Sequence, residues 1–162
     1  MRTFNILSLT RLSADDRAKI EAVDPATYSG PCQVVEVRKA RGELIQPADF
    51  ADVMIRAKRA LFKTGSFPDP NHFNEDFVAF SGESIDELAS RGVVLVGIDT
   101  PSIDAFHTKA LPAHHATTRA GMAILEGIVL DAVEPGLYEL IAIPLKLEGA
   151  DASPVRALLR PL

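Results

Sequence analysis

Two adjacent histidines and a glutamate carry the side chains most suited to chemistry in this sequence. His114 and His115 precede Glu126, which lies inside the apolar run of residues 122–130. A carboxylate in such a run is expected to be buried, and a buried charge is unfavourable unless it is paired or bound to a metal. Imidazole and carboxylate groups are common metal ligands. The stretch is therefore a candidate metal site; the alternative is that the histidines are exposed while Glu126 pairs with Arg or Lys.

The spacing of these residues limits how they can meet. On one continuous helix, the separation between His114 and Glu126 corresponds to about 18 Å of rise and roughly 120° of rotation. The two side chains can converge only if the chain turns between them. Gly121 is a suitable turning point because glycine often ends a helix in the left-handed conformation. We therefore predict a helix over residues 112–120, with Pro112 at its first position, and a buried strand over 122–130.

A helix and a strand are expected to deliver further polar groups to the same region. Ser84 and Glu87 form a capping-box pattern, which predicts a helix from Ser84 to about residue 91 that ends at Gly92. Residues 93–98 are wholly apolar and rich in β-branched side chains, as is typical of a buried strand. Asp99 follows directly at the carboxyl end of this strand, where α/β proteins often place functional groups.

The loop of residues 97–104 has two interpretations. It is either a tight turn in which Asp99 caps nearby amides, or a segment in which Asp99 or Ser102 supports the metal-binding histidine from behind. His72, in the predicted loop of residues 64–74, is either solvated or lines the pocket. Further donors that could complete a metal site are Asp99, Asp104 and His107.

The remaining pattern predicts a mixed α/β domain with more strand than helix. Alternating or apolar runs indicate strands over residues 4–9, 32–38, 53–60, 137–147 and 155–160. Residues 13–23 begin with a helix-start pattern, and residues 47–52 are predicted to form one helical turn. The 162 residues are expected to form one domain.

Composition narrows the class of protein. The net charge of −5 and the scattered basic residues give no footprint for nucleic acid. The sequence has no apolar run of about 18 residues that could span a membrane, and no signal peptide pattern. The single cysteine, Cys32, cannot form an internal disulfide, which fits a reducing cytoplasm. We therefore expect a cytoplasmic protein that binds neither nucleic acid nor membrane.

Several blocks of the sequence resemble a known family. They include GIDTPSID at residues 97–104, KALPAH at 109–114, AILEG at 123–127 and PLKLEGADASPVR at 144–156, with YSGPCQVVEV at 28–37 and NEDF at 74–77 upstream. In this order they are similar to bacterial kynurenine formamidase (arylformamidase), one of the metal-dependent cyclase-like hydrolases. The resemblance covers residues 20–162, whereas residues 1–19 diverge.

The resemblance implies a fold, a reaction and a metal. The fold is a mixed, barrel-like sheet of the β/β/α swivelling-domain type. The reaction is hydrolysis of N-formyl-L-kynurenine to L-kynurenine and formate in tryptophan degradation, with water activated by a divalent metal, usually zinc. His114 and Glu126 match two of the metal ligands, and His115 has no assigned role. Members of the family are usually homodimers.

The sequence also departs from this family. The other ligands of the family lie in an N-terminal motif of the form His-x-Gly-x-His-x-Asp-x-Pro, and this sequence has no histidine before His72. It resembles the family without its first third, as an N-terminally truncated chain would. Since a catalytic zinc site needs about three protein ligands, we expect weak or absent formamidase activity from the isolated chain. The alternative function is a catalytically inactive remnant of the family.

Overall fold

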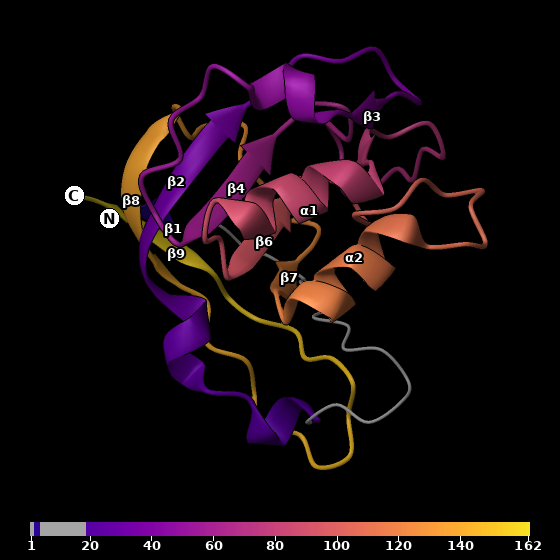
Figure 1. Cartoon of the computed structure of the whole chain (residues 1–162). Helices are drawn as coiled ribbons and strands as arrows, with labels where there is room; N and C mark the ends of the chain where they lie inside the picture. The colour runs from indigo at the N-terminus through magenta and orange to yellow at the C-terminus, as the bar shows by residue number, and fades with distance from the viewer. Residues whose placement is uncertain (1, 4–18) are drawn as a thin grey trace.

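A mixed seven-stranded sheet forms the centre of the protein. The computed structural model describes residues 2–3 and 19–162, and the order of strands across the sheet is β1-β9-β8-β2-β4-β6-β7 (Figure 1). The strands are β1 (Arg2–Thr3), β2 (Ser29–Glu36), β4 (Arg59–Lys63), β6 (Leu95–Ile98), β7 (Ala123–Leu125), β8 (Gly136–Ile141) and β9 (Leu158–Pro161). The mixed α/β class predicted from the sequence is confirmed.

The sheet has a parallel half and an antiparallel half. Strands β2, β4, β6 and β7 run parallel to one another. In the other half, β8 pairs with β2, β9 with β8 and β1 with β9, each in antiparallel fashion. A separate pair of short parallel strands consists of β3 (Leu44–Ile45) and β5 (Ala79–Phe80). The carboxyl ends of the parallel strands lie at one edge of the sheet, which is where α/β proteins place their sites.

Two helices cover one face of the sheet. Helices α1 (Gly82–Ser90) and α2 (Pro112–Ala120) pack against each other and lie side by side in Figure 1. Beneath them, Phe62 and Ile124 belong to a buried apolar cluster, while Leu61 belongs to a second cluster on the opposite face. This division follows from the alternation of side chains along a strand. Short 3₁₀ turns occupy Ile20–Ala22, Pro25–Tyr28 and Pro47–Phe50.

The predicted helix of residues 112–120 is confirmed at both ends. Pro112 stands at its first position, and Gly121 ends it with φ of 66°. The predicted strand of residues 122–130 is much shorter, because β7 spans only Ala123–Leu125 and Gly127, also at φ of 66°, turns the chain away. Glu126 therefore lies just beyond the end of the strand.

The other helix begins earlier than predicted. The N-cap of α1 is Ser81, whose hydroxyl accepts a hydrogen bond from the amide of Ser84 at 3.1 Å. The Ser84 hydroxyl is buried and donates to the carbonyl of Ile45 at 2.6 Å, so it is unavailable as a cap. The choice of Ser84 as the first residue was wrong, whereas the predicted end near Gly92 is correct.

Several strand boundaries also differ from the sequence-based expectation. Residues 53–58 precede β4 and are not strand, and β8 stops at Ile141, before Pro144, which cannot donate to a ladder. The last predicted strand is β9. Of the predicted helix over residues 13–23, the described part holds only the 3₁₀ turn at Ile20–Ala22. The predicted strand over residues 4–9 lies outside the described residues.

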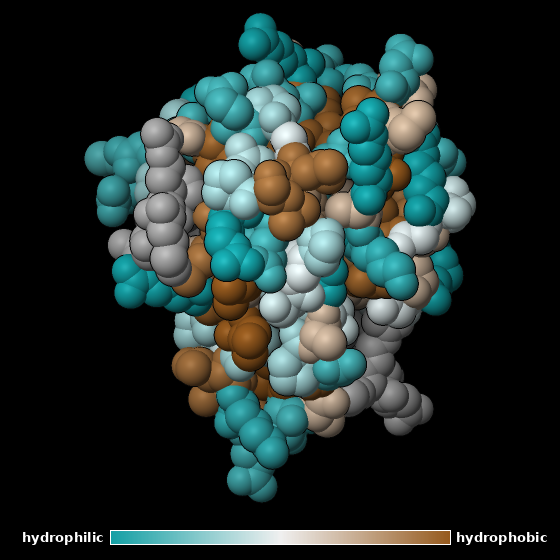
Figure 2. Space-filling model, turned by 90° about the vertical axis from the view of Figure 1, so that its left-hand side faces the viewer, coloured by the Kyte–Doolittle hydropathy of each residue, from teal (hydrophilic) through white to brown (hydrophobic). Residues whose placement is uncertain are grey.

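The surface of the β8 side carries apolar side chains among hydrophilic ones (Figure 2). On β8 and the segment after it, the exposed apolar side chains are those of Leu137, Ile141, Ile143, Leu145 and Leu147. Within β8, Leu137 and Ile141 lie on the same face because side chains alternate along a strand, and the other three follow in the segment after the strand. In the part of the chain that the structure describes, neither α-helix is long and apolar enough to cross a membrane.

Candidate functional site

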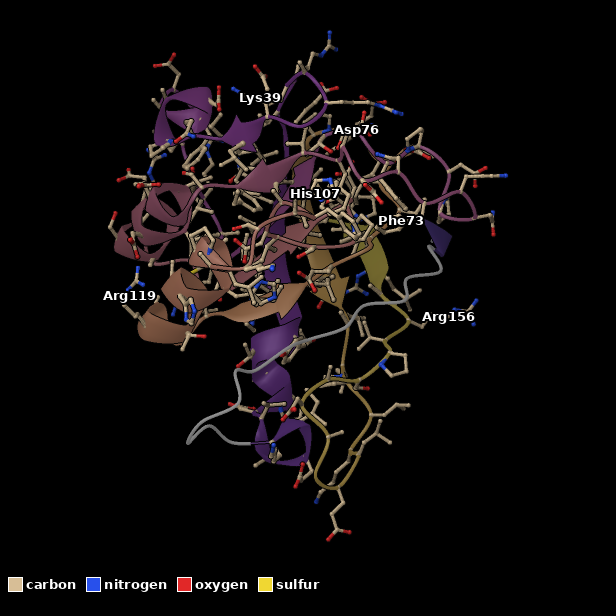
Figure 3. All side chains as sticks on the ribbon, turned by 90° about the vertical axis from the view of Figure 1, so that its right-hand side faces the viewer. Lys39, Phe73, Asp76, His107, Arg119 and Arg156 are labelled. Carbon is tan, nitrogen blue, oxygen red and sulfur yellow. The ribbon has the colours of Figure 1, made fainter. Side chains whose placement is uncertain are left out.

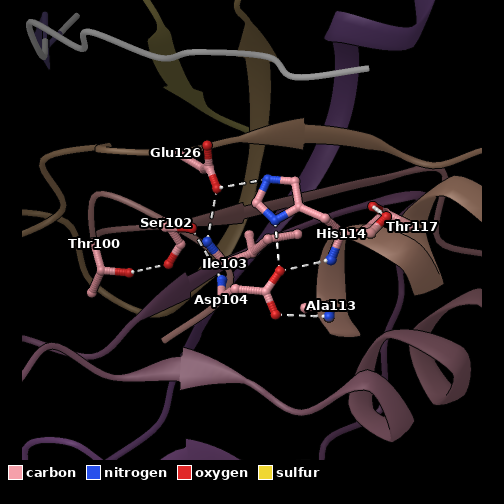
Figure 4. Close-up of polar contacts among 8 residues, drawn as sticks. All are labelled: Thr100, Ser102, Ile103, Asp104, Ala113, His114, Thr117 and Glu126. Carbon is pink, nitrogen blue, oxygen red and sulfur yellow. Dashed lines mark hydrogen bonds and ion pairs between the residues drawn. The ribbon is translucent and has the colours of Figure 1, made fainter. Parts of the chain in front are cut away.

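His114 lies in the first turn of α2 and points toward the end of β7 (Figure 4). The residue before the helix, Leu111, adopts a left-handed conformation with φ of 44°, and Pro112 then starts the helix. The His114 side chain is 13% exposed. Nδ1 of its ring faces Asp104, and Nε2 faces Glu126.

Asp104 binds both the helix end and the imidazole ring. Its Oδ1 accepts a hydrogen bond from the amide of Ala113 at 2.9 Å, and its Oδ2 accepts one from the amide of His114 at 3.0 Å. Oδ2 also lies 2.6 Å from Nδ1 of His114. Burial acts to raise the pKa of Asp104, but these hydrogen bonds outweigh it and hold the pKa below its usual range. Because the ionised carboxylate only accepts, Nδ1 carries the proton.

Glu126 faces the other nitrogen of the ring. Its Oε1 lies 3.6 Å from Nε2 of His114 and accepts a hydrogen bond from the amide of Ile103 at 2.8 Å. The hydroxyl of Ser102 also hydrogen-bonds to this carboxyl group. Burial raises the pKa of Glu126 above its usual range, and the charge of His114 and the Ile103 amide only partly oppose this.

This arrangement favours a positive group between the ring and the carboxylate. With Nδ1 protonated by its bond to Asp104, the neutral ring presents the lone pair of Nε2 to the oxygen of Glu126. Two acceptors at 3.6 Å attract each other only through a shared proton or a cation. On the other side of the ring, the pairing of Nδ1 with the Asp104 carboxylate is a usual way to orient a metal-binding imidazole.

The donor set fits two positions of a metal site. Imidazole nitrogen and carboxylate oxygen suit zinc and related divalent ions. Among residues 2–3 and 19–162, however, no group of three or more His, Cys, Asp or Glu side chains is placed to hold an ion. Asp104 cannot be the third ligand since it occupies the opposite side of the His114 ring. The described residues thus match part of a metal site and not a complete one.

A pocket of about 260 Å³ opens beside Glu126. One part of its wall is acidic, and the rest is aromatic and aliphatic. The lining residues include Phe67, Phe73, Asp99, Glu126, Ile128 and Asp131. The volume lies just below the usual range for drug-sized ligands, so the pocket suits a small molecule with a single ring.

The structure brings together His114, Glu126 and Ser102, with Asp104 on the other side of the His114 ring. His114 and Glu126 face each other, and Ser102 contacts Glu126. Asp99 lines the pocket, but its carboxylate accepts hydrogen bonds from the amides of Thr64 and Gly65, both at 2.8 Å. Its contacts are those of the turn interpretation.

The remaining histidines lie away from this pair. His72 is exposed and pairs with Asp69 at 2.6 Å, so it does not face the pocket chemistry. His107 is exposed too and pairs with Glu75 at 3.3 Å. His115, the neighbour of His114, is exposed on α2.

Sequence reasoning missed the role of Asp104. It was a candidate ligand, whereas its carboxylate holds the ring of His114 from behind. The signal that could have found it is an acidic residue in the loop before a helix that starts with proline, because a carboxylate is favoured at the N-terminal amides.

Comparisons with known proteins show the family of this chain. The family model described as putative cyclase matches residues 10–105. The chain belongs to the cyclase family. A kynurenine formamidase from Sphingopyxis alaskensis is 44% identical over 148 residues, which cover 91% of this chain and 70% of that protein. The resemblance to kynurenine formamidase found in the sequence is thereby confirmed.

Solved structures share the cyclase-family fold. A potential metal-dependent hydrolase with cyclase activity superposes with a TM-score of 0.84 at 29% identity, over 94% of this chain and 76% of the other. A predicted metal-dependent hydrolase from Bacillus stearothermophilus superposes with a TM-score of 0.80 at 29% identity, over 96% of this chain and 75% of the other. Isatin hydrolase A from Labrenzia aggregata superposes with a TM-score of 0.78 at 22% identity, over 94% of this chain and 71% of the other. At this identity the comparison supports a shared fold only.

Proposed function

We propose that this protein is an arylformamidase-type hydrolase that converts N-formyl-L-kynurenine and water to L-kynurenine and formate. The observation that carries the proposal is the convergence of His114 Nε2 and Glu126 Oε1 at 3.6 Å, with Glu126 also lining a pocket that contains aromatic side chains. The 44% identity to a kynurenine formamidase supports the choice of reaction. An amide bond to an aromatic amine suits a pocket whose lining combines carboxylates with phenylalanine and aliphatic side chains.

We propose a divalent metal, with zinc as the first candidate, held in part by His114 and Glu126. Two structural relatives are described as metal-dependent hydrolases, which supports this assignment. When bound, such an ion lowers the pKa of a coordinated water and polarises a carbonyl group. Further ligands must come from groups other than the two described here, since two donors do not hold a catalytic ion.

Each described residue has a distinct task in this proposal. Asp104 keeps the proton of His114 on Nδ1, so that Nε2 presents its lone pair to the ion. Glu126 supplies negative charge from a buried position, and the amide of Ile103 and the hydroxyl of Ser102 fix its orientation. The pocket beside it holds the aryl group and excludes water from the formyl end.

The test is hydrolysis of N-formyl-L-kynurenine by the purified chain, with a chelator and after zinc is restored. His114→Ala and His115→Ala form a matched pair, because the residues are neighbours on α2 and only His114 faces Glu126. Because the described residues supply only two donors, we expect weak turnover, which the chelator and His114→Ala abolish and His115→Ala preserves. A folded, zinc-treated chain without turnover would instead favour the inactive remnant.

We also propose that the protein forms a homodimer. The row of exposed apolar side chains on the β8 side supports this, because apolar patches on soluble proteins often mark interfaces. Light scattering after size-exclusion chromatography should give twice the chain mass of 17.5 kDa. A mass of one chain at micromolar concentration would contradict the dimer.

A further inference from the structure

Phe73 is an exposed aromatic ring at the edge of the candidate pocket. Its side chain is 58% exposed, although it belongs to a group of phenylalanines that contact one another. It lies in the loop between β4 and β5 (Figure 3). A large apolar ring left open to water beside a pocket is a common mark of a binding surface.

The ring of Phe73 is held in place by other aromatic rings. Its centroid lies 5.9 Å from that of Phe67, 6.2 Å from that of Phe77 and 5.3 Å from that of Phe106, each in an edge-to-face arrangement. Phe77 is buried and anchors the group. Such pairs prefer offset or edge-to-face geometry, so they orient the exposed ring without covering it.

The base of the loop is fixed by hydrogen bonds that keep Phe67 beside the pocket. The carboxylate of Asp99 accepts from the amide of Thr64 at 2.8 Å, and the hydroxyl of Ser66 accepts from the amide of Val78 at 2.9 Å. The side chain of Asn74 donates to the carbonyl of Ser66 at 3.3 Å. The two ends of the loop are therefore tied together, and its aromatic side chains have defined positions.

Phe67 and Phe73 face the same pocket as Glu126. Ile128 and Leu130 contribute aliphatic surface to that pocket, and none of its described lining residues is basic. A ligand that fills it would place a flat apolar group between phenylalanine and aliphatic side chains and a hydrogen-bond donor, such as an amide N–H, near Glu126. This is the shape of an amide whose nitrogen is bonded directly to an aromatic ring.

We infer that Phe67 and Phe73 form the aryl-binding wall of this site and that Phe73 selects N-aryl amides over N-alkyl amides of equal size. The inference rests on the proposed function for the identity of the reaction but concerns binding alone. Neither residue takes part in bond cleavage. Phe106, which contacts Phe73 but does not line the pocket with Glu126, has no direct part in this selection.

The test uses two ligands that differ only in aromaticity, acetanilide and N-cyclohexylacetamide. Their acetyl group slows hydrolysis, so NMR titration can report binding without turnover. We expect the unaltered chain to prefer acetanilide and Phe73→Leu to weaken acetanilide binding by roughly 3- to 10-fold, as loss of an aromatic pair predicts. Binding of N-cyclohexylacetamide should change less than about twofold.

Phe106→Leu is the matched control, since Phe106 is also exposed (48%) and belongs to the same aromatic group. It should alter acetanilide binding less than about twofold. Equal effects of Phe73→Leu and Phe106→Leu, or no preference for acetanilide in the unaltered chain, would overturn the inference. Both variants change exposed side chains, so circular dichroism should show an intact fold.

Kinetics separate this inference from the proposed function. If N-formyl-L-kynurenine is hydrolysed, Phe73→Leu should raise KM and leave kcat within about twofold, because the ring contributes to binding. An unchanged KM would refute the aryl wall while the hydrolase assignment stands. Phe73-dependent binding of acetanilide without any turnover would refute the hydrolase assignment while the aryl wall stands.

Discussion

Replacing Asp104 by Asn should destabilise the first turn of α2 and the position of the His114 ring. The carboxylate accepts three hydrogen bonds, from the amides of Ala113 and His114 and from the His114 ring. An amide has only one oxygen, so its NH₂ group must face one of these donors. A lost hydrogen bond to a charged acceptor costs about 1.5–3 kcal/mol, and each remaining bond loses ~1 kcal/mol when its acceptor becomes neutral. The free energy of unfolding should therefore fall by roughly 3–5 kcal/mol.

The same substitution should impair metal binding. If the NH₂ group of Asn donates to Nδ1 of His114, the ring proton moves to Nε2 and the lone pair facing Glu126 disappears. Loss of a carboxylate that orients a ligating histidine typically lowers metal affinity 10- to 100-fold. Competition with a coloured zinc chelator would measure this change, and urea denaturation followed by circular dichroism would measure the stability.

Asp86→Asn is the control for Asp104→Asn. Asp86 is an exposed helix residue that pairs with Arg119 at 3.1 Å, and such surface pairs contribute less than about 1 kcal/mol. Its replacement should leave zinc affinity unchanged. If Asp104→Asn were no more destabilising than Asp86→Asn, the three hydrogen bonds would not stabilise the protein as argued.

Three further predictions concern pH and packing. In metal-free protein, the free energy of unfolding should decrease as pH rises from 4.5 through the raised pKa of Glu126, because the folded state binds that proton more tightly. Glu126→Gln should remove this slope and stabilise the metal-free chain at pH 8 by roughly 0.5–2 kcal/mol, as urea titrations at several pH values would show. The ionised Asp104, whose pKa is lowered, stabilises the folded state above its usual pKa of 3.8, and this stability is lost as pH falls below that value. Asp104→Asn should therefore reduce the dependence of the free energy of unfolding on pH at the acid end of the same titrations. Gly97→Ala should destabilise by about 1–3 kcal/mol in thermal unfolding, because its Cβ would lie 2.5 Å from Leu61 Cδ2.

The sequence was most informative where backbone chemistry is local. Pro112 and Gly121 define both ends of α2, because proline suits a first turn and glycine adopts positive φ. Ser84 shows the limit of such patterns. Ser81 and Ser84 are both suitable caps, and the choice depends on the carbonyl of Ile45, which binds the Ser84 hydroxyl. That contact joins residues far apart in the chain and leaves no local trace.

In the candidate site, too, local patterns could be read from the sequence and contacts between distant residues could not. A turn at Gly121 was enough to predict that His114 and Glu126 could converge, and they do. The contact between Asp104 and His114 depends on how the loop before α2 folds back, so its role could not be read from spacing. The aromatic part of the pocket lining was also missed, because Phe67 and Phe73 line the same pocket as Glu126 only in the folded chain, where Asp99 and Ser66 tie down their loop.

The most direct measurement is anomalous diffraction from zinc-soaked crystals of the unaltered chain. The account predicts a zinc peak between His114 and Glu126, about 2.0–2.2 Å from Nε2 and from a carboxylate oxygen. Crystals of Glu126→Gln soaked in the same way should lack this peak. A zinc ion bound elsewhere in a chain that hydrolyses N-formyl-L-kynurenine, with His114 and Glu126 still bridged by a proton, would contradict the assignment of these two residues as metal ligands.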